Sequence, residues 1–215
     1  MRMIKIENIT KTFRNQGNPV QGLKKTSLKI KEGSFLVIVG PSGSGKTSLL
    51  NIIGGLDTPT TGQITVKDRN LKNLSDKELS NYRNNEIGFV FQEFHLEPEM
   101  TVLDNVLLPT LFSKDKKDKK EKATELIKEV GLTKKINQKT KALSGGEKQR
   151  TAIARALINN PTIIIADEPT GNLDAETGKI ILNLLKKIHK NHKTTLIIAT
   201  HDEKVASATK QQIKL

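Results

Sequence analysis

Four short apolar runs recur along the chain, and each is continuous rather than alternating with polar residues. They occupy residues 35–39, 87–91, 163–166 and 196–199. Runs of this kind are typical of strands that are covered on both faces, as in a parallel sheet. Helical patterns separate them: residues 48–53 follow the first run, and an apolar stripe precedes the last, formed by Ile180, Ile181, Leu184, Leu185 and Ile188. The pattern predicts an α/β fold with a mainly parallel sheet.

Two regions add to this pattern. Antiparallel strands that flank the core are suggested near the start of the chain by Ile4, Ile6, Leu28 and Ile30. The middle shows no convincing strand, and the spacing of an amphipathic helix is found there at Ala123, Leu126, Ile127 and Val130. We therefore expect a single domain, residues 1–215, in which an α/β core of residues 1–91 and 144–215 carries an inserted helical sub-domain, residues 92–143.

Composition narrows the class of protein. The 215 residues suit one compact domain, and the absence of cysteine excludes disulfides, thiolate metal sites and a cysteine nucleophile. No apolar stretch approaches the length of a membrane span, and polar residues interrupt any signal-peptide core near the start. We expect a soluble, cytoplasmic protein.

The charge balance suggests an acidic partner. The formal net charge is +13, which would suit a nucleotide, a nucleic acid or an anionic lipid headgroup. The excess is lysine, 30 residues against 6 arginines, whereas planar recognition of phosphates or bases prefers arginine. No specific nucleic acid is therefore expected. The lysine-rich stretch 114–122 is of low complexity, and most such runs are solvated.

The first candidate chemistry directly follows the apolar run 35–39. It fits the phosphate-loop pattern G-x-x-x-x-G-K-[ST] between a strand and a helix, with Gly40, Pro41, Ser42, Gly43, Ser44, Gly45, Lys46 and Thr47, and Ser48 next. Glycines let backbone N–H groups point at a phosphate, and the helix adds its positive N-terminal end. Lys46 would supply a charge for the β- and γ-phosphates, and the Thr47 hydroxyl a ligand for Mg²⁺. The sequence predicts a nucleotide-binding site.

Two carboxylates follow the apolar run 163–166. Asp167 and Glu168 would lie at the carboxyl edge of a parallel sheet, where ligands collect in such folds. We expect Asp167 on the Mg²⁺ side. Because side chains alternate along a strand, Glu168 points differently and is placed to activate a water for attack on the γ-phosphate. Alone, the pair would more often be two solvated acids; beside a phosphate loop, the functional interpretation is favoured.

Ser144, Gly145, Gly146 and Glu147 form a second candidate. They predict a capping box, in which Ser144 caps a helix and Glu147 reaches back to it. That interpretation leaves the two glycines unexplained, since glycine in a helix is unfavourable by up to about 1 kcal/mol relative to alanine. They would also let a phosphate approach bare N–H groups. The residues alone leave the two interpretations open.

These segments together resemble the ATP-binding-cassette ATPases over nearly the whole chain. The resemblance is carried by residues 40–47, Gln92, residues 143–150, 163–168 and 171–174, and His201. The phrases at 49–57, 87–92 and 169–174 look like the branch that serves macrolide export, lipoprotein release and antimicrobial-peptide resistance. The resemblance implies a P-loop NTPase core with ATP and Mg²⁺ as ligands. Only residues 205–215 remain for the closing strands, so we expect no C-terminal regulatory function.

The resemblance also implies roles for single residues. Phe13 matches the aromatic on which adenine stacks, and Gln92 the glutamine that reaches Mg²⁺ and the attacking water and links to the membrane partner. His201 matches the switch histidine that contacts the γ-phosphate and Glu168. In each case ordinary packing or a plain strand end is the alternative. Asp174 would lie near the seam between two cassettes.

In the family, two cassettes dimerise head to tail. The resemblance therefore implies a homodimer, or a pair with a closely related ATPase subunit, in which Ser144–Glu147 of one chain closes over the γ-phosphate held by residues 40–47 of the other. The implied function is that of an ATPase subunit that drives a separate membrane permease from the inner face of the cell membrane, for export or extraction of lipophilic or peptide substrates. The alternatives are an ATP-gated regulator of an envelope complex and a DNA-repair-type ATPase, which would need a long coiled-coil insertion.

Overall fold

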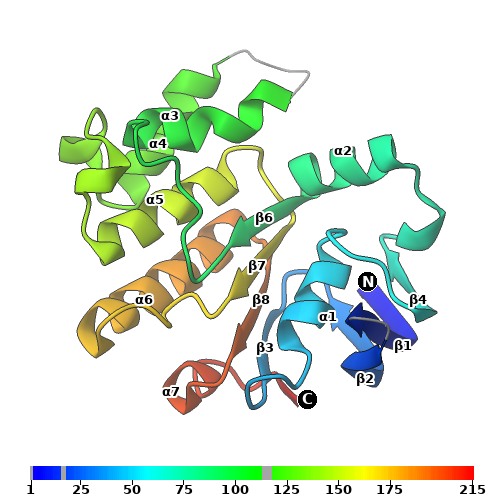
Figure 1. Ribbon diagram of the computed structural model, residues 1–215. Helices are drawn as coiled ribbons and strands as arrows, with labels where there is room; N and C mark the ends of the chain where they lie inside the picture. The colour runs from blue at the N-terminus through cyan, green and yellow to red at the C-terminus, as the bar shows by residue number, and fades with distance from the viewer. Residues whose placement is uncertain (1, 16–17, 113–117) are drawn as a thin grey trace. The chain divides into compact units, whose positions relative to one another are not determined.

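A computed structural model describes residues 2–15, 18–112 and 118–215 of the chain. The chain divides into two compact units, Met1–Arg83 with Thr195–Leu215, and Asn84–Thr194 (Figure 1). Residues 114–117, which belong to the lysine-rich stretch, lie outside the described residues. Within those residues, the structure contains no helix whose length and hydropathy would suit a membrane span.

An antiparallel sheet forms one part of the first unit. Its strand order is β2-β1-β4-β5, with bounds β1 Arg2–Asn15, β2 Asn18–Lys31, β4 Thr61–Val66 and β5 Arg69–Asn70. Ile4 pairs with Ile30 and Ile6 with Leu28, which confirms the predicted antiparallel strands. Ile4 and Ile6, which lie two positions apart on β1 and therefore on the same face, are both buried.

Parallel strands form the other part of this unit. The strand β3 (Phe35–Val39) pairs in parallel with β8 (Thr195–Thr200) and with β9 (Gln212–Lys214). The loop after β3 leads into α1 (Lys46–Ile53), and the short α7 (Glu203–Ala206) follows β8 (Figure 1). The helix α2 (Asp76–Glu86) begins in this unit, where the Tyr82 hydroxyl donates to the carbonyl of Ile53 over 2.7 Å.

The second unit combines two parallel strands with helices. The strand β6 (Ile87–Val90) pairs with β7 (Ile163–Asp167). The helices are α3 (Val102–Leu107), α4 (Lys119–Glu129), α5 (Gly145–Leu157) and α6 (Ala175–His192), with 3₁₀ turns at Leu108–Phe112, Thr133–Lys135 and Thr140–Ala142. The first three helices pack against one another (Figure 1). The four predicted parallel strands are thus confirmed to within a residue or two at their ends.

Two details differ from the expected pattern. Ile180 is half exposed rather than part of the buried stripe of α6, since it lies about 100° around the helix from the buried Ile181. Lys122, in the lysine-rich stretch, is only partly solvated: its ammonium donates to the Ile158 carbonyl over 2.6 Å and to Asn160 Oδ1 over 2.5 Å. The described residues of 92–143 contain helices, turns and one isolated bridge, Thr101 to Lys139. The assignment of residues 92–143 as an inserted helical sub-domain stays a prediction.

Candidate functional site

The phosphate loop lies between β3 and α1, as the sequence predicts. Gly45, directly before α1, has φ of 100°, a conformation that L side chains rarely adopt. A β-carbon there would also lie 2.6 Å from the carbonyl oxygen of Gly22 on β2. Both facts require glycine at this position. The loop therefore brings bare backbone to the N-terminus of α1, where a phosphate can be bound.

The ammonium group of Lys46 lies against the backbone of this loop. The residue is 7% exposed, and its ammonium donates to the carbonyls of Gly40 over 2.8 Å and Pro41 over 3.0 Å. A buried ammonium needs such partners to offset the loss of water. Thr47 follows in the first turn of α1 and is exposed. No acidic residue occupies that first turn, so nothing on it repels an anion.

Phe13 lies beside the loop through Gly22. Its ring contacts Gly22 so closely that a β-carbon on that glycine would be 2.2 Å from Cε2. Phe13 is 43% exposed, and the Lys11 ammonium lies 5.1 Å from the ring centroid. Gly22 therefore contacts both Phe13 and Gly45. The sequence interpretation missed Gly22, although a glycine inside a strand often marks a close approach of another group.

His201 directly follows β8 and lies at the same edge of the parallel strands as the phosphate loop. Val39 pairs with Thr200, so Gly40 and His201 both directly follow paired residues of β3 and β8. His201 is exposed, and the next residue, Asp202, caps α7. The first unit thus contains the phosphate loop, Phe13 and His201.

Gln92 and the two carboxylates lie at one sheet edge in the second unit. Val90 pairs with Ala166, so the residues that follow β6 and β7 emerge together. The Gln92 side chain donates to Asn172 Oδ1 over 2.9 Å, and Asn172 donates back to the Gln92 carbonyl over 3.1 Å. Asn172 has no role in the sequence interpretation. This reciprocal pair joins the segment after β6 to the segment after β7.

Glu168 adopts an unusual backbone conformation. Its φ is 46°, in the left-handed region that non-glycine residues seldom occupy. A turn holds it, since the N–H of Gly171 donates to the Glu168 carbonyl over 3.0 Å. Residues in such conformations cluster at functional sites, at a cost on the order of 1–3 kcal/mol. Asp167 is the last residue of β7, one position earlier.

The predicted capping box at the start of α5 is confirmed. Ser144 Oγ accepts from the N–H of Glu147 over 3.3 Å, and the Glu147 carboxylate accepts from the N–H of Ser144 over 2.9 Å. This backbone hydrogen bond lowers the pKa of Glu147, with a smaller contribution from Lys135. A β-carbon on Gly146 would lie 2.6 Å from Cγ2 of Thr177 on α6, so packing within the chain supplies one reason for glycine there.

Asp174 caps the neighbouring helix α6. Its side chain accepts from the N–H groups of Glu176 over 3.1 Å and Thr177 over 2.9 Å. Hydrogen bonds from Thr177, first from the side chain and then from the backbone, lower the pKa of Asp174. The starts of α5 and α6 together surround an open hollow of about 250 Å³, lined by Ser144, Gly145, Gly146, Arg150, Asn172, Leu173, Asp174, Thr177 and Ile180.

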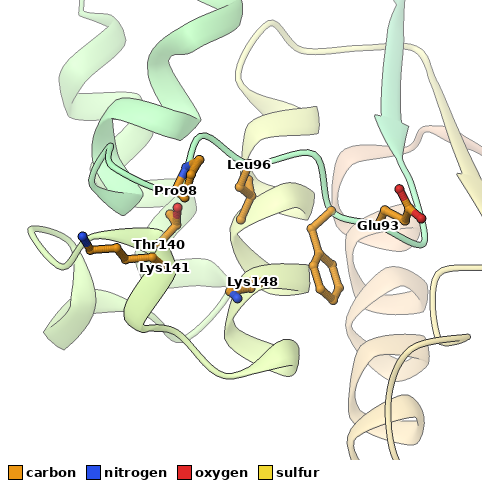
Figure 2. Close-up of a pocket in the computed structure, with 7 residues that line it drawn as sticks. Glu93, Leu96, Pro98, Thr140, Lys141 and Lys148 are labelled. Atoms are coloured by element: carbon orange, nitrogen blue, oxygen red, sulfur yellow. The ribbon is translucent and has the colours of Figure 1, made fainter.

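A second hollow, of about 150 Å³, lies where the segment after β6 meets the helical part of this unit. Figure 2 shows Leu96 and Pro98 of that segment near Thr140 and Lys141, with Lys148 of α5 beside them. The Lys141 ammonium also pairs with Glu99 over 2.8 Å. The hollow has an apolar side and a lysine rim, which none of the sequence motifs predicted.

The three residues expected at Mg²⁺ carry suitable donors. Thr47, Gln92 and Asp167 offer hydroxyl, amide and carboxylate oxygens, the hard ligands that Mg²⁺ prefers. In the described part of the chain, no three His, Cys, Asp or Glu residues cluster closely enough to hold a metal. The three side chains therefore match the ligand preference of Mg²⁺ by donor type.

Known proteins resemble this chain over most of its length. Residues 23–171 match the family model described as ABC transporter. The uncharacterized ABC transporter ATP-binding protein MJ0796 of Methanocaldococcus jannaschii is 47% identical over 209 residues, which are 95% of this chain and 89% of that protein. The lipoprotein-releasing system ATP-binding protein LolD of Saccharophagus degradans is 42% identical over 214 residues, 99% of this chain and 94% of LolD.

A fusion protein and a solved structure complete the comparison. The macrolide export ATP-binding/permease protein MacB of Bdellovibrio bacteriovorus is 46% identical over 213 residues, but the chain spans only 32% of MacB. The dimeric post-hydrolysis structure of the MJ0796 cassette, bound to ADP and Pi, has a TM-score of 0.90 at 44% identity and covers 99% of this chain and 94% of that one. The α/β fold and the resemblance found in the sequence are confirmed. The chain belongs to the ABC transporter family and is an ATP-binding cassette with ATPase activity.

Proposed function

We propose that the chain is the motor subunit of a transporter, which binds ATP between two cassettes and drives a separate membrane permease from the inner face of the cell membrane. The observation that carries the proposal is the pairing of two anion-binding elements on one chain: the phosphate loop with its buried Lys46, and the capped start of α5, which faces an open hollow. The second element would receive the γ-phosphate of ATP on the partner chain.

The proposed roles follow the positions of the side chains. Residues 40–48 bind the triphosphate and Phe13 stacks on adenine. Thr47, Gln92 and Asp167 would hold Mg²⁺, which when bound neutralises phosphate charge. Glu168 takes the proton of the attacking water. His201 contacts the γ-phosphate.

The partner and substrate classes are inferred from relatives. MacB and LolD are named for macrolide export and lipoprotein release, so a lipophilic or peptide substrate is the class that we propose. The DNA-repair alternative lacks support, since the longest helix in the described residues, α6, has 18 residues and is not a long coiled-coil arm. Copurification with a coexpressed permease would test the partner; a cassette that never associates with one would argue for a regulatory role.

The decisive experiment is the substitution Glu168→Gln. It keeps the shape of the side chain and removes the base, so ATP hydrolysis should fall by roughly 10² to 10⁴ while ATP binding persists. The variant should also elute as a dimer in the presence of ATP on gel filtration. Glu125→Gln, an exposed carboxylate on α4, is the matched control and should hydrolyse ATP at the normal rate. Normal turnover by Glu168→Gln would overturn the assignment.

A binding experiment complements the hydrolysis experiment. Lys46→Ala should weaken ATP binding roughly tenfold or more, because hydrogen bonds to charged groups contribute about 1.5–3 kcal/mol. Lys24→Ala, an exposed lysine of the same unit, is the control. Unchanged affinity in Lys46→Ala would contradict the phosphate-loop assignment.

A further inference from the structure

We propose that Gln149 is a positioning residue that fixes the segment carrying Gln92 against the segment carrying Glu168. The inference rests on the proposed function, because it is these two residues that we place at the attacking water. Gln149 lies on α5, one helical turn after Gly145, and does not itself reach solvent: it is 0% exposed.

One amide group bonds to both segments. Gln149 Nε2 donates to the carbonyl of Pro169 over 2.7 Å and, more weakly, to the carbonyl of Phe91 over 3.4 Å. Phe91 directly precedes Gln92, and Pro169 directly follows Glu168. The contacts therefore fall next to both proposed catalytic residues, on the backbone rather than on their side chains.

Packing alone does not explain glutamine at this position. A fully buried site on a helix would ordinarily take an apolar residue, and Gln149 Oε1 is buried without a hydrogen bond to the described residues. An unmade bond of this kind is unfavourable. The two carbonyls, however, need two N–H donors at one point, which a primary amide supplies and neither a carboxylate nor an alkyl chain can.

Both segments need external support because their backbones are irregular. Glu168 has φ of 46°, while Phe94 and His95, shortly after Gln92, have φ of 58° and 47°. Arg155, also on α5, donates to the carbonyls of Phe94, over 2.7 Å, and His95. The helix α5 thus forms hydrogen bonds to the segment after β6 through both Gln149 and Arg155. Gln149 also bonds to the segment after β7.

The test compares Gln149→Leu, Gln149→Met and Gln149→Glu in the full chain, with ATP hydrolysis measured from pH 6 to pH 9. Both apolar variants remove the donors, so kcat should fall at least tenfold, while KM for ATP should change less than twofold because the phosphate loop belongs to the other unit. Thr151→Val is the matched control: Thr151 is buried on the same helix, and among the described residues its hydroxyl donates only to the Glu147 carbonyl of α5 itself, so kcat should be unchanged.

The glutamate variant provides a readout that a merely structural role would not change. An ionised carboxylate has no donor and would face two carbonyls, whereas the protonated form can donate to Pro169. Burial raises the pKa of such a carboxyl. The activity of Gln149→Glu relative to wild type should therefore rise as the pH falls, and that of Gln149→Leu should not.

Several results would overturn the inference. These are wild-type kcat in both apolar variants, a loss of ATP affinity as large as the loss of kcat, a Gln149→Glu profile that follows Gln149→Leu at every pH, or failure of both apolar variants to fold, which would make the amide a requirement for stability. Each leaves the proposed function intact. If the wild-type chain did not hydrolyse ATP, or if Glu168→Gln hydrolysed it normally, the proposed function itself would fail.

Discussion

The ring of Phe13 lies against Gly22, and a β-carbon on Gly22 would overlap its Cε2 atom. Gly22→Ala should therefore displace the ring from its position beside the phosphate loop. Stacking of an aromatic side chain on a base contributes about 1–3 kcal/mol, so the Kd for ATP should rise roughly fivefold or more. Phe13→Ala should raise the Kd for ATP in the same way. Calorimetric titration with ATP measures both.

Gly178→Ala provides the control for this substitution. A β-carbon at Gly178 would meet Thr170 at an ordinary 3.4 Å, so α6 should accept alanine without loss of ATP affinity. If Gly22→Ala bound ATP as tightly as wild type while Phe13→Ala did not, the ring would have another stable position. If both bound normally, Phe13 would have no part in adenine binding.

Two capping boxes in the second unit allow stability to be separated from function. Ser144→Ala and Thr101→Ala each remove the hydroxyl that caps a helix, α5 and α3 respectively, so each should lower the free energy of unfolding by about 1 kcal/mol. Urea denaturation measures this change. Only Ser144→Ala should also weaken the ATP-dependent dimer formed by Glu168→Gln; equal effects of the two variants on the dimer would contradict the proposed role of Ser144.

The close contact between Gly146 and Thr177 predicts a compensating pair. Gly146→Ala places a β-carbon 2.6 Å from Thr177 Cγ2 and should destabilise the protein by roughly 1–3 kcal/mol, as overpacking does. Thr177→Ser removes that methyl group and keeps the hydroxyl. The double variant should recover most of the loss in thermal unfolding, which a double-mutant cycle quantifies. Additive losses would show that alanine is excluded for another reason.

Lys122 should make stability depend on pH in the alkaline range. Desolvation first, and repulsion from Lys119 second, lower its pKa from 10.5 to about 8. Between these values the unfolded chain binds more protons than the folded chain, so the free energy of unfolding should rise with pH from about pH 8 to 10. The comparison with Lys122→Met by urea denaturation isolates this group. A difference that stays constant or falls over that range would contradict the lowered pKa.

The parts of the site that the sequence predicts are those encoded locally. The phosphate loop needs eight consecutive residues between a strand and a helix, and the capping box at Ser144 needs four, so pattern and spacing suffice. The contact of Gly22 with Gly45 and the bonds of Gln149 join residues far apart in the chain, and no periodicity reports them. Ile180 lies at the exposed edge of the apolar stripe on α6, and the sequence pattern does not define where the buried part of a stripe ends. Lys122 was placed among solvated lysines because composition does not show which ammonium finds carbonyl partners.

The division into two compact units has an evolutionary consequence under the proposed roles. Residues that hold the nucleotide belong to Met1–Arg83 and Thr195–Leu215, whereas the water-activating carboxylate and the partner-facing helix start belong to Asn84–Thr194. Substitutions in the first unit can then change the affinity for ATP, and substitutions in the second unit can change the rate of hydrolysis. During adaptation to a new transport substrate, evolution could therefore change the turnover rate of the protein while its affinity for ATP stays the same.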